Sequence, residues 1–263
     1  MISGIANSSY NALEASLRKR FSHGLSFLAS YTYSKAIDDV SAFNISGSGS
    51  IQVAGENDLA QNPNNLAAER GPSLFDARHR LVFSYQWSIP FWSQHQQGWY
   101  QHVLGGWQLN GILTAMSGTP FTVFDSRDVS DQGGAPEITG FSANRPNLVA
   151  GQNSNSGPRT VSTWLNANAY ARITPNPNSP VQQFGTAGRN SALGPRYTNW
   201  DFAASKYIRL AESKQLQFRA ELFNVMNHPN FHLPNGDISS PTFNQILAAE
   251  PPRLIQMALK LRF

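Results

Sequence analysis

The chain has 263 residues, a formal net charge of +4 and only 14% charged residues, against about 25% in an average soluble domain. Cysteine is absent, which excludes disulfides, thiolate catalysis and cysteine-bound zinc. The 20 Lys and Arg residues are scattered, which argues against a nucleic-acid interface, and no run of about 18 apolar residues exists to form a transmembrane helix.

The first predicted element is a β-hairpin. Asn11–Arg20 and Leu25–Ser34 both alternate apolar and polar side chains with the two-residue period of a strand. Residues 21–24, which end in glycine, are all that separates the two segments, so a tight turn is expected between them. One face of the second segment is formed by Phe27, Ala29, Tyr31 and Tyr33.

Four further predicted strands show the same alternation. They are Arg78–Ile89, Gly106–Met116, Trp200–Ile208 and Gln215–Val225. Amphipathic aromatic rings are stable at the boundary between lipid headgroups and hydrocarbon, so aromatic residues near strand ends suggest membrane interfaces. The predicted interface aromatics are Tyr31, Tyr33, Trp87, Trp107 and Trp200. Core aromatics of a soluble sheet are the alternative interpretation.

The last predicted strand runs from Arg253 to the end of the chain. One face carries Ile255, Met257, Leu259, Leu261 and Phe263, whereas the other carries mainly polar residues such as Lys260 and Arg262. In the wall of a membrane β-barrel only every second strand residue meets lipid, which is the pattern seen here. The terminal strand therefore makes a membrane barrel the leading hypothesis.

The connections between the predicted strands alternate between short ones of about 4, 15 and 4 residues and long ones of about 40, 80 and 25. In an up-and-down sheet every second connection lies at the same end, so the pattern predicts brief periplasmic turns and long extracellular loops. The long stretches 36–77, 119–196 and 228–251 are rich in Pro, Asn and Gly, which predicts turns rather than a core. A short strand at Thr163–Tyr170 is expected to extend the wall outward.

Charged residues on the predicted polar faces are expected to face the barrel lumen, where they would line a permeation path or form ion pairs against a plug. These residues are Arg18, Asp201, Arg219 and Glu221. No nucleophile elbow, P-loop or dinucleotide motif occurs. His228 and His232 stand four apart, but Pro229 rules out the regular helix that a helical metal pair needs. Neither an enzyme activity nor a metal or cofactor is expected.

Four stretches stand out as motifs: the terminal strand ending in Phe263, Gly105–Leu113 (GGWQLNGIL), Phe75–Arg80 (FDARHR) and Gln217–Phe231 (QFRAELFNVMNHPNF). Together they resemble the C-terminal barrel of TonB-dependent outer-membrane receptors of the Oar-like group. The resemblance covers residues 1–263 and implies an all-β, antiparallel barrel of about 22 strands, of which this chain would form about seven. It also implies a plug and a TonB complex that energises transport. Since no signal peptide, TonB box or plug is recognisable, the chain is expected to be the last third of such a receptor.

The resemblance implies an outer-membrane protein that takes up or binds a large nutrient such as a carbohydrate, peptide or chelate. Its expected partners are outer-membrane lipid, the barrel-assembly machinery, which would read the terminal strand, and the missing N-terminal barrel and plug. The ligand stays unnamed, and nucleic acid is not expected. The alternative hypothesis is a soluble, secreted, carbohydrate-binding β-sandwich, in which a second protein layer would cover the apolar faces.

Overall fold

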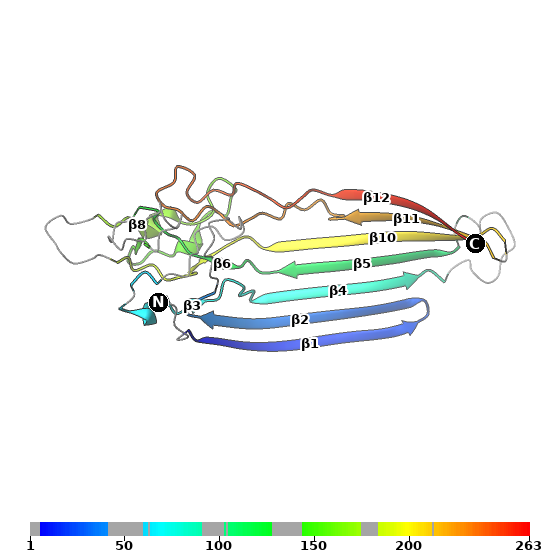
Figure 1. Cartoon of the computed structure of the whole chain (residues 1–263), viewed down its shortest axis with the longest axis horizontal. Coiled ribbons are helices and arrows are strands. Elements are labelled where there is room, and N and C mark those ends of the chain that lie inside the picture. The colour runs from blue at the N-terminus through cyan, green and yellow to red at the C-terminus, as the bar shows by residue number, and fades with distance from the viewer. Residues whose placement is uncertain are drawn as a thin grey trace.

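The computed structural model describes residues 6–41, 60–62, 64–90, 103, 105–127, 144–174, 184–211 and 213–263. Its main element is one antiparallel sheet of eight strands (Figure 1). The long strands lie side by side in chain order: β1 (Ser8–Ser22), β2 (Leu25–Asp38), β4 (His79–Ser88), β5 (Trp107–Met116), β10 (Tyr197–Arg209), β11 (Gln215–Phe223) and β12 (Leu254–Arg262). The eighth, β3 (Gly71–Pro72), pairs with the end of β2. The predicted antiparallel meander is confirmed.

The register places the apolar positions of all the long strands on one face. Residues that stand directly opposite in a ladder point to the same side of the sheet, so a row of partners can be followed from strand to strand. One such row is formed by Phe27, Tyr85, Gly111, Phe202, Leu222 and Ile255. The apolar faces that the alternation predicts for the separate strands therefore join into one continuous surface.

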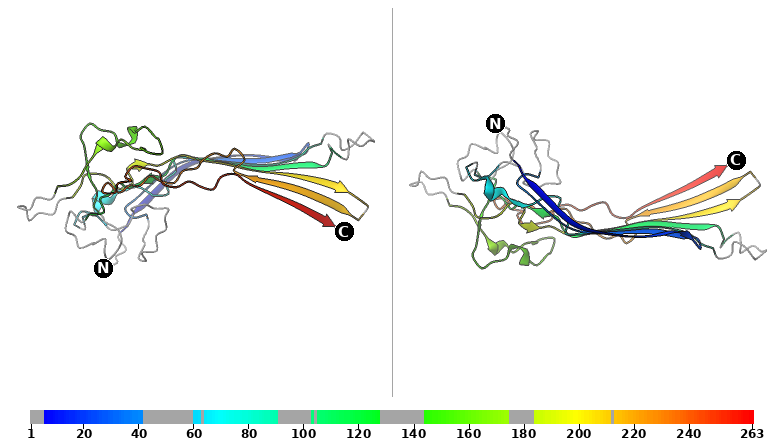
Figure 2. Two further views of the ribbon diagram at one scale, coloured as in Figure 1. Left: turned by 90° about the horizontal axis from the view of Figure 1, so that it is seen from above. Right: turned by 90° about the horizontal axis from the view of Figure 1, so that it is seen from below.

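In the described part of the chain no protein layer covers this apolar face. Leu17 retains 64% of its exposure, Met257 70% and Leu259 69%. Figure 2 shows the sheet edge-on as a single twisted layer, with β1 and β12 as its open edges. A β-sandwich would bury its apolar faces against each other, which the described sheet does not do, whereas lipid would cover this face in a barrel wall.

Connection lengths segregate to the two ends of the sheet as predicted. The turn 23–24 and the described residues between β10 and β11 lie at one end, near the C-terminus, and the described parts of the three long connections lie at the other (Figure 1). The third predicted short connection, between β4 and β5, lies mostly outside the described residues. His23 and Gly24 have φ of 52° and 79°, so both central residues of the first turn are left-handed, as a type I′ hairpin requires.

We expect Gly24→Ala to destabilise the complete barrel by more than about 2 kcal/mol, because the left-handed backbone alone costs a non-glycine residue about 1–2 kcal/mol. A Cβ at Gly24 would also lie 2.1 Å from the Ser88 carbonyl oxygen. Gly151→Ala is the matched control, since φ there is +75° but nothing lies within 4 Å of the added Cβ. Urea unfolding in detergent measures both variants. Equal losses of stability would show that the contact with Ser88 contributes nothing.

The described parts of the long connections pack together into a lobe at one end of the sheet (Figure 1). We define this loop lobe as residues 120–127, 144–174, 184–193 and 230–246. Its buried apolar core consists of Phe121, Val123, Leu165, Ala169, Tyr170, Ala187 and Ala192. The expectation that these stretches supply turns rather than a core is therefore wrong. Each segment contributes only a few apolar residues without periodicity, so the core forms only when distant segments meet.

Short elements organise the lobe: η2 (Ser154–Ser156), and two small sheets that pair β6 (Pro120–Phe121) with β9 (Ala192–Leu193) and β7 (Asn147–Leu148) with β8 (Tyr170–Ala171). In the described structure, Thr163–Tyr170 does not form the expected strand that would extend the wall. The Asn166 side chain there accepts a hydrogen bond from Asn168 N and starts η3 (Ala167–Ala169) instead. Like η2 and η3, η1 (Leu66–Glu69) is a short 3₁₀ turn, and among the described residues no helix has the length and apolar character to cross a membrane.

Candidate functional site

The face opposite the apolar surface forms a polar wall, and three of the four predicted lumen residues meet on it. Arg219 pairs with Ser205 of β10, and Glu221 pairs with Ala203, so both lie on the face that carries Asp201. Arg219 Nη2 lies 2.6 Å from Glu221 Oε1, in an exposed ion pair along β11. Arg18 pairs with Leu28 of β2 on the same face, but three strands separate β1 from β10.

Asp201 has a local structural role. Its Oδ1 atom accepts hydrogen bonds from Asn199 Nδ2 and from the backbone N–H of Asn224, both at 2.9 Å. Asn224 has a left-handed φ of 51° and directly follows β11. The Asp201 carboxylate therefore fixes the backbone where β11 ends. This structural role is separate from the lumen-facing role predicted from the sequence.

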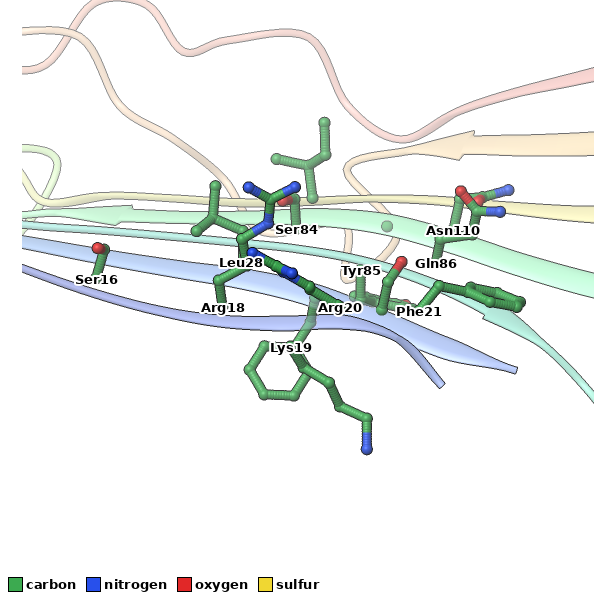
Figure 3. Close-up of a pocket in the computed structure, with 14 residues that line it drawn as sticks. Ser16, Arg18, Lys19, Arg20, Phe21, Leu28, Ser84, Tyr85, Gln86 and Asn110 are labelled. Atoms are coloured by element: carbon green, nitrogen blue, oxygen red, sulfur yellow. The ribbon is translucent and has the colours of Figure 1, made fainter. Parts of the chain in front are cut away.

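A concavity of about 980 Å³ lies over the polar wall beside Arg18. Its lining includes Arg18, Arg20, Ser26, Ser84, Gln86 and Asn110 and contains no acidic side chain. Figure 3 shows Arg18 with Ser84, Gln86 and Asn110 on one side of the ribbon, while Lys19 projects from the other. This part of the wall is cationic and rich in hydrogen-bonding groups, so it suits anionic or amide-bearing groups.

The five predicted interface aromatics all lie on the apolar face, towards its two ends. Trp87 pairs with Leu25 beside the first short turn, and Trp107 opens β5 near the same end, whereas Tyr31, Tyr33 and Trp200 lie towards the lobe. Tyr33 is about 26 Å along β2 from Leu25 at a rise of about 3.3 Å per residue, or about 20 Å along the membrane normal for a strand tilted by about 40°. The apolar band of outer-membrane barrels is about 25 Å tall, so two aromatic rings fit its boundaries.

The terminal strand presents its predicted apolar residues on the same face. Ile255, Met257, Leu259 and Leu261 stand opposite Leu222, Ala220, Phe218 and Leu216 of β11. Phe263 follows β12 and retains 91% of its exposure. Since β12 pairs with β11 alone in the described sheet, its other edge offers unpaired backbone groups to a further strand.

A buried charge network that the sequence did not reveal joins the lobe to the barrel wall. The Glu69 carboxylate accepts hydrogen bonds from Arg145 Nη1 at 2.6 Å and Nη2 at 3.0 Å, and both side chains are only about 5% exposed. Glu69 Oε1 also accepts from the backbone N–H of Gln61 at 2.9 Å. The Gln61 side chain in turn bonds Arg145 N and the carbonyl oxygen of Gly185.

Arg189 carries the network on to β2. Its Nε donates to the Glu69 carbonyl oxygen at 2.9 Å, and its Nη2 donates to the carbonyl oxygen and the carboxylate of Asp38, the last residue of β2. We call Asp38, Glu69, Arg145 and Arg189 the Glu69 network. Paired ions of this kind are stable when buried only if most of their donors are satisfied. The network therefore ties the end of β2 to two connections, the one between β2 and β4 and the one between β5 and β10.

A second polar cluster orders the lobe around Asp237. Its Oδ1 accepts hydrogen bonds from Ser239 N at 2.9 Å, Ser239 Oγ at 2.6 Å and Ser126 N at 3.2 Å. Burial acts to raise the pKa of Asp237, but these hydrogen bonds outweigh it and lower the pKa below its ordinary value. The stabilisation is therefore present above the unfolded pKa of about 4 and is lost as the pH falls through the folded value.

The histidine pair noted in the sequence is not arranged as a metal site. His232 Nε2 lies 3.3 Å from Glu250 Oε1, and the backbone N–H of His228 donates to Asn224. Among the residues that the structure describes, no group of three or more His, Cys, Asp or Glu side chains is placed to hold a metal ion.

Comparison with known proteins gives one family. A family described as an outer membrane beta barrel domain matches residues 1–256. No curated protein matches the chain. Among solved structures, the outer membrane transporter YddB from Escherichia coli is similar at 11% sequence identity and a TM-score of 0.46, over 98% of this chain and 25% of that one. The chain thus spans about a quarter of the length of that transporter.

Proposed function

Because this chain belongs to the outer membrane β-barrel domain family, we propose that it is the C-terminal section of a TonB-dependent outer-membrane receptor of the Oar-like group. The family places the chain in the outer membrane. The proposed receptor binds a large nutrient at the cell surface and passes it through the barrel lumen, without catalysing a reaction.

One observation carries this proposal: the sheet has a continuous apolar face, a charged and amide-rich opposite face, and two open edges. In lipid, each unpaired backbone N–H or C=O at an edge costs several kcal/mol, so further strands must close the wall. Closure would turn the polar wall with Arg18, Asp201, Arg219 and Glu221 towards an enclosed lumen. The proposed receptor also needs a plug that fills this lumen and the TonB complex, which energises transport.

The loop lobe is the proposed outer binding surface. It lies at the long-connection end of the sheet, which is the extracellular end in barrels of this kind. Its packed core and the Glu69 network hold it in one shape before a ligand arrives, which lowers the entropic cost of binding. Asn, Gln, Tyr and Trp side chains in the long connections suit hydrogen bonding and stacking, so a carbohydrate, peptide or chelate is the proposed ligand class.

The terminal strand has a separate proposed role. Phe263 and the alternating Leu261, Leu259, Met257 and Ile255 would be recognised by the barrel-assembly machinery, which would add β12 to the membrane through its open edge. Outer-membrane lipid then covers the apolar face that is left exposed here.

Uptake in cells tests the proposed transport. A strain that lacks the complete gene is complemented with the wild type or with a variant in which 144–174 is replaced by a short Gly-Ser linker. Accumulation of labelled oligosaccharides, oligopeptides and ferric chelates is then measured with and without a protonophore. We expect uptake of one class to require the gene, to stop with the protonophore and to be lost in the linker variant.

Heat-dependent gel mobility shows that each protein has folded as a barrel in these cells. Uptake that continues in the presence of the protonophore would indicate a passive pore and contradict TonB dependence. If the uptake of every tested compound were the same with and without the gene, the proposed transport function itself would be contradicted.

A further inference from the structure

We propose that the apolar face carries, at its lobe end, a binding site for the phosphorylated headgroup of an outer-leaflet lipid, formed by Lys35, His79 and Arg196. The three residues come from β2, β4 and the residue before β10, and all three are exposed. This proposal rests on the lipid-facing side and the orientation of the sheet and does not require that the barrel transports anything.

Strand register brings Lys35 and His79 together. Tyr33 of β2 stands directly opposite His79 of β4, so both side chains point to the apolar face. Lys35 is the next residue of β2 on that face, two positions closer to the lobe. Diagonal neighbours in a sheet lie about 7–8 Å apart, which the long lysine side chain can span to share one ligand with His79.

Register also places Arg196 in the same row. Met116 pairs with Tyr197, and further along the chain Pro120 pairs with Leu193 in unchanged register, so Ser117 and Arg196 stand opposite each other between them. Ser117 is joined to His79 by two hydrogen bonds, from Ser117 N to His79 O at 2.9 Å and from His79 N to Ser117 Oγ at 3.2 Å. The row therefore runs from Tyr33 through His79 and Ser117 to Arg196.

The His79 ring is held in position by two tyrosines. Tyr31 Oη lies 2.8 Å from His79 Nδ1, and the Tyr33 ring centroid lies 5.1 Å from that of His79. With Nδ1 engaged, the second ring nitrogen is the one left to meet a ligand. Tyrosines mark the headgroup level of a membrane interface, so the row lies where lipid phosphates are found.

Charge at this rim favours an anion. Two nearby carboxylates already have cationic partners: Asp39 Oδ1 lies 3.6 Å from Arg70 Nη1, and Asp76 Oδ2 lies 3.0 Å from Arg78 Nε. The Glu250 carboxylate, which acts on the neighbouring Tyr197, lies 3.3 Å from His232 Nε2. Among the described residues neither Lys35 nor Arg196 is in an ion pair, so both offer positive charge beside a fixed imidazole. Arg and Lys donate strong charge-assisted hydrogen bonds to phosphate, and basic clusters at membrane surfaces recognise anionic headgroups in this way.

Native mass spectrometry of the complete protein in detergent tests the site, with bisphosphorylated lipid A and its dephosphorylated form as probes. A single charge-assisted contact changes affinity by about tenfold or more. We therefore expect one bound lipid, retained at least about a hundredfold better in the phosphorylated form, because Lys35 and Arg196 both lose their partner when the phosphates are removed. Lys35→Gln combined with Arg196→Gln removes two such contacts and should lower retention about a hundredfold. Lys19→Gln is the matched control, because Lys19 lies on the same face near the opposite rim and should leave retention unchanged.

Equal retention of the two lipid forms by the wild type would overturn the proposal, and this comparison needs no variant to fold. An equal loss of retention in Lys19→Gln would overturn the location, because it would indicate a general charge effect. Full competition by free inorganic phosphate would also overturn it, since the site is assigned to a headgroup anchored in the membrane. Nutrient uptake is measured separately, so loss of lipid retention with intact uptake, or the reverse, distinguishes this site from the transport function.

Discussion

Glu69→Gln is expected to unfold the loop lobe while the strands of the barrel stay paired. The substitution keeps the shape of the side chain but removes the negative charge that Arg145 meets with two hydrogen bonds inside the protein. Leaving one member of a buried ion pair uncompensated typically costs about 3–5 kcal/mol. Hydrogen exchange of the complete protein should therefore show lost protection in 144–174 and 184–193 and unchanged protection in β10 and β11.

Two further variants give this prediction its controls. Glu221→Gln breaks the exposed ion pair with Arg219, and exposed pairs contribute at most about 1 kcal/mol, so exchange in the lobe should not change. Glu69→Leu combined with Arg145→Met removes both charges and should recover much of the lost protection, because apolar replacements of buried pairs are often neutral. If Glu69→Gln and Glu221→Gln had the same effect on the lobe, the Glu69 network would not be what anchors it.

The wall of the barrel was predictable because the membrane imposes a period of two on every strand that it covers. The predicted segments Asn11–Arg20 and Gln215–Val225 coincide with β1 and β11 to within a few residues at their ends. The sequence placed the end of β2 too early, at Ser34. The strand continues to Asp38, where the last residues lose alternation but pair with β1 and with β3.

Lys206 shows where alternation alone misleads. It stands opposite Trp107 and Phe218 on the apolar face, where a charge is unexpected. Its Nζ atom donates to the carbonyl oxygens of Val103 and Gly105, and it lies 5.6 Å from the centroid of the Trp107 ring. A lysine near the end of a strand can bury its aliphatic stem and satisfy its ammonium group at the rim, so the face stays compatible with lipid.

The lobe was not predictable because its contacts join residues that are far apart in the chain. Arg145 meets Glu69 across 76 positions, and Arg189 meets Asp38 across 151. No periodicity marks these residues in segments rich in Asn, Gly and Pro. The one available signal was chemical: in a chain with only 14% charged residues, single charges inside uncharged loops are the ones to examine for buried partners.

Leu259→Arg is expected to destabilise the complete barrel by about 2–4 kcal/mol, the cost of an arginine near the bilayer midplane on the lipid face of a barrel. Leu259 stands opposite Phe218 on the apolar face and is 69% exposed, so no protein contact accounts for its hydrophobicity. With Phe263 at the periplasmic boundary, Leu259 lies about 10 Å inside the apolar band for a tilted strand. Urea unfolding in phospholipid vesicles measures the loss.

Lys260→Gln separates the lipid face from the polar wall. Lys260 stands opposite Gln217 on the other side of the same strand, where water or a plug would meet it, so its replacement should leave the unfolding free energy almost unchanged. Leu259→Arg adds one positive charge to the apolar face, and Lys260→Gln removes one from the opposite face at the neighbouring position. If both variants lost a similar amount of unfolding free energy, the two faces would not differ in their surroundings. That result would contradict the assignment of the apolar face to lipid.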